Sequence, residues 1–315
     1  MRRFIGLLVR TARFYGHDAL QFLARVLSKD AHDARTRLLS RVSARIHVVE
    51  KGLTMPGMRP NFGEGNIRAL VRDCEACIAS DLSGHFVLRN AIGVLEEYER
   101  THSEIGKAVP SDIVSGIRAL VAQYPEVAPL HQTIVRKSDL FARGDFAEIA
   151  HARHSIRNFS GPVNETSLRK ALELAGTAPS SCNRQSVRIH VIGHGKAFDG
   201  ILASHHGNRG FGPQADRLIL VASDRAVYTD PAERHAVFVD GGIYTMNLLY
   251  CLHYFGIAAC TLNCFFNPPE ERRIAAILKT KDIPVALIAI GDCPDEVKLA
   301  RSARVPWNEH VTWHS

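Results

Sequence analysis

The local pattern of the sequence changes near residue 139, and this change limits the folds open to the chain more than any other feature. Before it, apolar residues recur at the spacing of about 3.6 that marks amphipathic helices. The segments with this spacing are 4–27, 31–49, 67–78, 86–101 and 111–123. After it, helical patterns alternate with short apolar runs. The sequence therefore predicts an all-helical region over residues 1–138 and a second domain over residues 139–315.

The second domain combines strands with helices that can cover them. Its predicted strands are four short apolar runs bounded by turn residues, at 187–192, 217–222, 257–262 and 285–290. Its predicted helices are 139–152, 165–176 with Asn164 or Thr166 as cap, 197–204, 232–255, and one opened by Asn267, two prolines and Glu270. This order suits a central sheet that helices cover.

Charge and cysteine content narrow the function classes. A formal net charge of +7 over 315 residues is mild, so it favours solubility and attraction of anionic cofactors rather than binding of nucleic acid. Seven cysteines, an odd number, without a convincing secretion signal favour reduced thiols and a cytoplasmic location. Cys74 and Cys77 lie in a predicted helix with no second pair at zinc spacing, so we expect buried apolar roles and no metal site.

The first helix is amphipathic and rich in arginine. The apolar run that ends at Arg10 is too short for a secretion signal, and no stretch reaches the roughly 20 apolar residues of a membrane span. The cations of this helix are Arg2, Arg3, Arg10, Arg13 and Arg25. Contact with an anionic membrane is one interpretation. Packing on its own domain or on a partner subunit is the favoured one.

Two polar motifs carry the functional signal. Residues 153–157 read Arg-His-Ser-Ile-Arg and offer two guanidiniums, an imidazole and a hydroxyl, which suit a phosphate group. Residues 178–185 read Ala-Pro-Ser-Ser-Cys-Asn-Arg-Gln, a turn of small polar groups. Neither glycine-rich phosphate motif occurs at a strand-to-helix turn. A phosphate would therefore be held by side chains, which disfavours a dinucleotide-binding or P-loop domain.

Residues 145–315 resemble the FMN-dependent nitroreductase family. The family pattern R-[RH]-S-x-[RK]-x-[FY] is matched at Arg153, His154, Ser155, Arg157 and Phe159, and the pattern A-P-S-S-x-N-x-Q at Ala178, Pro179, Ser180, Ser181, Asn183 and Gln185. Further landmarks follow in the family's order: Asn208 in a loop after one strand, the helix-to-strand turn at 247–257, and Arg304 shortly before Pro306. The resemblance covers the whole second domain, and its strength comes from the joint order of these landmarks.

The resemblance implies a fold, a reaction and an assembly. The fold would be α+β with three layers, in which helices flank a central mixed and mainly antiparallel sheet, here preceded by the all-helical region. The protein would be an FMN-dependent oxidoreductase that transfers hydride from NAD(P)H through FMN to a nitro, quinone or other small acceptor. The flavin would perform the chemistry, so no catalytic side chain is predicted. The protein would be a homodimer with FMN at its interface.

The resemblance also assigns roles to individual residues. Arg153, with Arg304 and Arg301 and aided by His154 and Ser155, would bind the FMN phosphate. Arg157 and Asn208 would lie at the pyrimidine edge of the flavin, where a cation favours the reduced anion. Pro179, Ser180, Ser181 and Asn183 would come from the other subunit, with Gln185 completing their motif. Leu262 and Asn263 would lie near flavin N5.

Departures from the family pattern keep two alternatives open. Ser186 and Val187 replace a proline and an aromatic residue, and Cys264, followed by two phenylalanines, stands where many members have glycine. A narrowed pocket would suit a specialised flavin dehydrogenase or oxidase acting on a biosynthetic intermediate. The helical region has no counterpart in a minimal member, so the chain could instead be a nitroreductase-like scaffold that docks a membrane or partner through its N-terminal helices.

Overall fold

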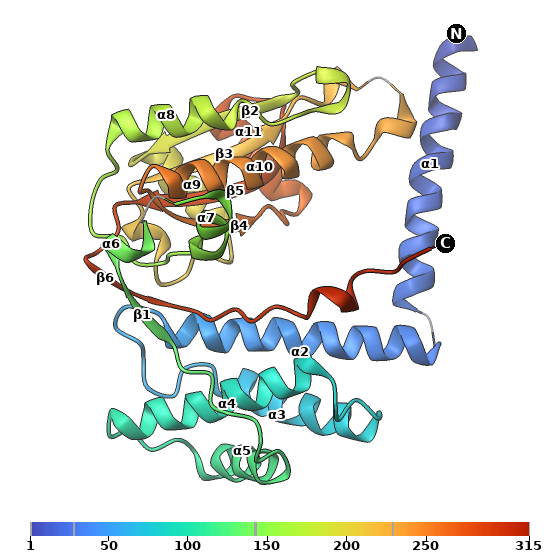
Figure 1. Ribbon diagram of the computed structural model, residues 1–315. Helices are drawn as coiled ribbons and strands as arrows, with labels where there is room; N and C mark the ends of the chain where they lie inside the picture. Colours follow the sequence, from blue (N-terminus) through green and yellow to red (C-terminus); the bar gives the residue numbers. More distant parts are fainter. Residues whose placement is uncertain (1, 28, 142–143, 229, 315) are drawn as a thin grey trace. The chain divides into compact units, whose positions relative to one another are not determined.

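The computed structural model describes residues 2–27, 29–141, 144–228 and 230–314, and the chain divides into two compact units (Figure 1). Residues 1–17 and 134–299 form one, which we call the sheet unit. Residues 18–133 and 300–315 form the other, which we call the helical unit. The main chain enters the sheet unit at Ile134, a few residues before the boundary predicted at 138/139, and the last residues return to the helical unit.

Five long helices precede the sheet unit's main part. They are α1 Arg2–Val26, α2 Ala31–Leu53, α3 Glu64–Ala79, α4 Phe86–Glu104 and α5 Ser111–Gln123, which confirms the helical pattern of the sequence. Helices α2 to α5 enclose one apolar core around the fully buried Tyr98. Cys74 and Cys77 lie in this core with no exposed surface, and burial raises the pKa of both thiols. Their apolar interpretation is therefore confirmed.

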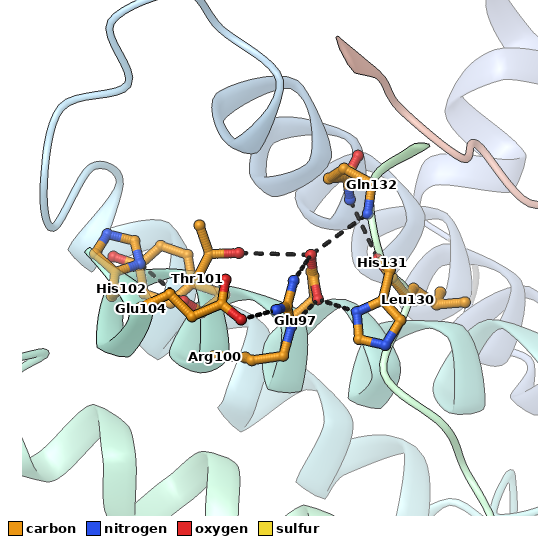
Figure 2. Close-up of polar contacts among 9 residues, drawn as sticks. Glu97, Arg100, Thr101, His102, Glu104, Leu130, His131 and Gln132 are labelled. Carbon is orange, nitrogen blue, oxygen red and sulfur yellow. Dashed lines mark hydrogen bonds and ion pairs between the residues drawn. The ribbon is translucent and has the colours of Figure 1, made fainter. Parts of the chain in front are cut away.

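A buried carboxylate holds the chain that leaves the helical core (Figure 2). Glu97 on α4 is 1% exposed, and its two oxygens accept hydrogen bonds of 2.8 Å from Arg100. Nδ1 of His131 lies 2.9 Å away, and the backbone of Gln132 donates at 3.4 Å. Burial opposes ionisation, but the hydrogen bonds from Arg100 and His131 outweigh it, so the pKa of Glu97 lies below its ordinary value.

The sheet unit is built on four antiparallel strands in the order β2-β3-β5-β4. They are β2 Val187–Gly193, β3 Arg217–Ser223, β4 Ala258–Asn263 and β5 Ile283–Gly291. Each coincides with a predicted strand to within two residues. Their apolar, β-branched composition suits strands that are covered on both faces.

Helices cover both faces of this sheet. Helices α8 Glu165–Ala175 and α10 Ala236–Tyr254 pack on one face, where residues such as Ile219 and Ile288 meet Leu248. Because side chains alternate along a strand, Leu220 points to the other face. Helices α9 Lys196–Ser204 and α11 Pro268–Leu278 bury their own apolar residues there. The three-layer α+β fold with a mainly antiparallel sheet is therefore confirmed.

Two predicted helix starts are confirmed in detail. The side chain of Asn164 accepts a hydrogen bond from the backbone of Ser167 at 2.9 Å, so Asn164, and not Thr166, caps α8. Asn267 and Glu270 form a reciprocal capping box at α11, with distances of 2.8 and 2.9 Å. Each cap satisfies backbone donors that the first helical turn leaves open.

The single helix predicted over 139–152 is wrong. The chain forms a short α6 Lys137–Leu140 and a separate α7 Phe146–Ala152, and residues 142–143 lie outside the described part. Asp145 accepts a hydrogen bond from the backbone of Glu148 at 3.0 Å, because an aspartate after glycine caps a new helix more readily than it continues an old one.

A small second sheet is also absent from the prediction. Strands β1 Thr133–Arg136 and β6 Glu296–Leu299 pair with each other, and each is too short to show a period in the sequence. Among the helices in the described part of the chain, none has both the length and the apolar character needed to cross a membrane.

Candidate functional site

The first motif is a short extended segment anchored on the sheet. It follows α7, and the backbone N–H of Ile156 donates to the carbonyl of Ala259 at the start of β4, at 2.9 Å. Ile156 and Phe159 are buried, at 1% and 8% exposure. The polar side chains between and before them, Arg153, His154, Ser155 and Arg157, remain half-buried. The apolar pair therefore fixes the backbone while the polar groups stay accessible to a ligand.

His253, near the end of α10, belongs with this motif. Its ring packs 5.1 Å from Phe141 and is 4% exposed. Burial, together with the positive charge of Arg153 and of His154, lowers the pKa of His253 to about 4. Its Nε2 atom is buried and has no hydrogen-bond partner among the described residues. In the sequence His253 is only a residue at the end of a helix, so sequence reasoning missed it.

The chemistry of this cluster fits an anion rich in oxygen. A buried ring nitrogen without a partner costs free energy, which a hydrogen bond to a ligand would recover. Arg153 and His154 supply positive charge at the same place. A phosphate monoester has three acceptor oxygens and about two negative charges, which match these donors. The residues present therefore fit the phosphate group that the first motif predicts.

The second motif forms a loop with an uncommon backbone. Ser181–Asn183 make one turn of 3-10 helix, and Cys182, Asn183 and Gln185 have φ values of 52°, 53° and 48°. Residues other than glycine rarely adopt this left-handed backbone conformation. Each such residue raises the free energy of the folded state by on the order of 1 kcal/mol or more. The surrounding structure must therefore hold the loop in place.

Asp240 on α10 provides that hold. Its carboxylate, 2% exposed, accepts hydrogen bonds from the backbone N–H and the hydroxyl of Ser181, both at 2.9 Å. The hydroxyl of Tyr228 donates to the same carboxylate at 2.5 Å and lies 2.8 Å from the hydroxyl of Ser186. Burial opposes ionisation, but these donors prevail, so the pKa of Asp240 lies below its ordinary value.

A salt bridge closes the other side of the loop. Arg184 donates to Glu233 at 2.5 Å and lies over the ring of Tyr228, 4.6 Å from its centre. Sequence reasoning missed Asp240, Tyr228, Arg184 and Glu233, since no local pattern links residues so far apart in the chain. With the loop held by Asp240 and Arg184, the side chains of Pro179, Asn183 and Gln185 are exposed, whereas Ser180 and Ser181 are half-buried.

The structure does not bring the two motifs together within one chain. The second motif leads into β2 and the first lies at the start of β4, and these strands form opposite edges of the sheet. The register also places the two strand starts at opposite ends of the sheet. Helix α10 gives the distance between the motifs, because Asp240 holds the second motif and His253 belongs with the first. At 1.5 Å per residue these two residues are about 20 Å apart.

Three other predicted residues gather around His205. Its Nε2 lies 2.7 Å from the carbonyl of Asn263, and its Nδ1 accepts from the backbone of Gly207 at 2.9 Å. The buried amide of Asn208 donates to the carbonyls of Leu202 and His205, at 2.7 and 3.1 Å. Leu262 is buried next to Asn263 at the end of β4. These hydrogen bonds fix the backbone between Leu202 and Asn208, and both amide protons of Asn208 are donated to backbone carbonyls there.

The last two predicted residues, Arg301 and Arg304, lie in the segment that belongs to the helical unit. The backbone N–H of Ser302 donates to the buried carboxylate of Glu50 at 3.2 Å, and Arg304 donates to the carbonyl of Ser302. The role of Arg301 and Arg304 toward a phosphate stays a prediction.

Known proteins resemble the C-terminal half of the chain. A Bacillus subtilis (strain 168) protein named "Putative NAD(P)H nitroreductase YdgI" is 27% identical over an alignment of 209 residues that covers 54% of this chain and 97% of that protein. A nitroreductase family protein from Clostridium difficile 630 is 24% identical, with a TM-score of 0.46 over 55% of this chain and 99% of its own. A "putative nitroreductase in complex with FMN" from Exiguobacterium sibiricum 255-15 is 20% identical, with a TM-score of 0.48 over 55% and 98%.

The model of the family described as "Nitroreductase family" matches residues 150–205. This stretch begins just before Arg153 and contains both motifs, together with α8, β2 and α9. The match therefore falls on the residues that the structure anchors through Ile156 and Asp240. Residues 150–205 therefore match the nitroreductase family, and the C-terminal half of the chain is similar to a protein that carries the nitroreductase name.

Proposed function

We propose that this protein is an FMN-dependent oxidoreductase that transfers hydride from NAD(P)H to a small acceptor such as a nitro compound or a quinone. The observation that carries the proposal is the position of Arg153 and His154 beside the buried, unpartnered Nε2 of His253, within or against the stretch that matches the family. A side-chain phosphate site of this kind agrees with the absence of a glycine-rich phosphate loop in the sequence.

In this proposal the first motif holds the phosphate end of the cofactor. Arg153, His154 and Ser155 would bind the phosphate oxygens, and the ring of His253 would donate a hydrogen bond to one of them. Arg157, four residues on, would place its guanidinium at the pyrimidine edge of the ring. A fixed cation there stabilises negative charge and so favours reduction. When bound, FMN accepts hydride from NAD(P)H and passes electrons on to the acceptor.

The separation of the two motifs supports a homodimeric site. The loop held by Asp240 exposes Pro179, Asn183 and Gln185, about 20 Å along α10 from His253 of the same chain. A second copy can bring its own loop to the flavin bound by the first. The proposal is therefore a homodimer with two composite sites, each with phosphate donors from one subunit and ring contacts from the other.

A second candidate function is a specialised flavin dehydrogenase or oxidase. The observation that favours it is the bulk that follows Asn263. Cys264 is half-buried, Phe265 is 88% exposed, and Phe266 packs 5.8 Å from the ring of His205. Large rings at this point would narrow the entrance to the flavin and select a particular substrate.

One set of measurements tests the proposal and separates the two candidates. Purified protein should absorb between 300 and 550 nm with the bands of a flavin and should release FMN on denaturation. A colourless protein that does not bind added FMN contradicts the proposal. Fast oxidation of NADH or NADPH with many nitroarenes and quinones supports the general reductase. Bound flavin that such acceptors oxidise only slowly supports the specialised enzyme.

A further inference from the structure

One side of helix α1 is fastened to the sheet unit, to which its first 17 residues belong. Nη2 of Arg10 donates to both carboxylate oxygens of Asp230 at 2.8 Å. Tyr15 accepts a hydrogen bond of 2.8 Å from Arg225, and Arg234 lies 5.0 Å from the ring centre of Phe14. Residues 10 and 14 lie four positions apart on one side of the helix, and Tyr15 lies at the edge of that side, so these contacts set which side of α1 is covered.

The other side of α1 is apolar and open. Ile5, Leu8 and Val9, which we call the outward face, are 54%, 60% and 61% exposed, and Phe4 at its border is 68% exposed. At 3.6 residues per turn Ile5 and Val9 point away from the side that carries Arg10 and Phe14, whereas Leu8, seven residues before Tyr15, lies at the border of the covered side. Four large, exposed apolar side chains within six residues form a contiguous apolar patch. Such patches mark surfaces that bind another molecule, so we expect the outward face to be covered.

The charge of this part of the chain indicates which partner. Residues 1–17 contain Arg2, Arg3, Arg10 and Arg13 and no aspartate or glutamate. Arg13 is exposed and lies beside Val9 on the helix surface. An apolar face bordered by the exposed Arg13, on a stretch of helix whose own residues up to position 17 include no acid, is the composition of helices that lie in the headgroup region of anionic membranes.

We propose that α1 rests on an anionic lipid surface, with the outward face inserted at the boundary between headgroups and acyl chains. A second copy of the chain is the less suitable occupant. A symmetric contact would place the same cationic helix against itself, and like charges would repel. Lipid phosphates meet the arginines with the opposite charge, while Asp230 and Arg225 hold the helix so that it presents its apolar side.

Vesicle sedimentation with the full-length, flavin-loaded protein tests the proposal. Wild type should bind vesicles that contain phosphatidylglycerol and stay in solution with phosphatidylcholine alone, and added salt should weaken the binding. Leu8→Glu should lower the partition by about tenfold or more because it removes one inserted side chain. Arg13→Ala should lower it about fivefold. The matched control Leu174→Glu, at a residue of α8 that is 43% exposed, should bind like wild type.

Two results would overturn the proposal. One is wild-type protein that ignores both kinds of vesicle. If Leu8→Glu then also lowers the oligomeric state, the outward face is a contact between copies. The other is equal vesicle binding by wild type and Leu8→Glu. Flavin content, read from the same samples, reports separately on the oxidoreductase proposal, so the two proposals fail independently.

Discussion

The carboxylate of Asp240 accepts both the backbone N–H and the hydroxyl of Ser181, each at 2.9 Å. This double contact joins the N-terminal part of α10 to a loop in which three residues occupy the left-handed region. The helix compensates for the strain of the loop, and the loop in turn buries the carboxylate. Changes at Asp240 should therefore affect the loop before they affect the rest of the fold.

Replacement of Asp240 by asparagine tests this link. The amide has one acceptor oxygen where Ser181 and Tyr228 require two, so a buried donor stays unsatisfied and the free energy of unfolding should fall by about 1–3 kcal/mol. Hydrogen exchange in residues 180–186 should accelerate, and FMN affinity should drop. The control is Asp199→Asn on an exposed turn of α9. Unchanged exchange in the loop would show that the contact does not hold it.

Replacement of His253 by phenylalanine should separate the contribution of the phosphate to FMN binding from that of the flavin ring. Phenylalanine keeps the contact with Phe141 but cannot donate to a phosphate, so FMN affinity should fall about tenfold. Riboflavin, which has no phosphate, should bind wild type and variant equally. Fluorescence titration with both ligands measures the difference. Equal loss of both would mean that His253 acts through packing alone.

The lowered pKa of His253 predicts a stability that depends on pH. The folded protein keeps the ring neutral down to pH about 4, whereas the unfolded chain takes up a proton near 6.5. Stability is therefore complete above pH 6.5 and declines as the pH falls toward 4, by up to about 3 kcal/mol. Urea unfolding of His253→Phe should lack this part of the decline. The same slope in both proteins would contradict the assignment.

Arg157→Ala tests the proposed position of its cation. The variant should bind FMN nearly as well as wild type, because the phosphate contacts remain, while NAD(P)H reduces the flavin at least tenfold more slowly. Stopped-flow absorbance follows the reduction. Arg188→Ala, at an exposed arginine on β2, is the matched control. A normal rate of reduction would remove Arg157 from the flavin edge.

Replacement of Glu97 should lower the stability of the helical unit. Glu97→Gln leaves Arg100 and His131 beside a neutral group, so the unit should lose about 2 kcal/mol or more at neutral pH. Because the pKa of Glu97 is lowered, wild type should lose the same contribution as the pH falls below about 4.5. Circular dichroism during urea unfolding measures both effects. The control is Glu75→Gln, at an exposed position on α3 in the same unit.

The sequence predicted those parts of the fold that depend on neighbouring residues. The helices and the four central strands follow from the spacing of apolar residues, and the caps at Asn164 and Asn267 follow from side chains three positions from their partners. The break at Asp145 was missed because the apolar spacing runs through it. The resemblance located both motifs. The roles of Asp240 and His253 could not be found, since the hydrogen bonds of Asp240 to Ser181 and the burial of His253 near the charge of Arg153 exist only after the chain has folded.

The length of α10 has a consequence for the proposed dimer. One end of this helix touches the loop that would cover the partner's flavin, and the other end touches the phosphate donors for its own. A rigid rod about 20 Å long would thus span the two reaction centres of the assembly. Occupancy or reduction at one centre that displaces the rod would alter affinity at the other, and a pair of such rods related by symmetry would make the coupling mutual.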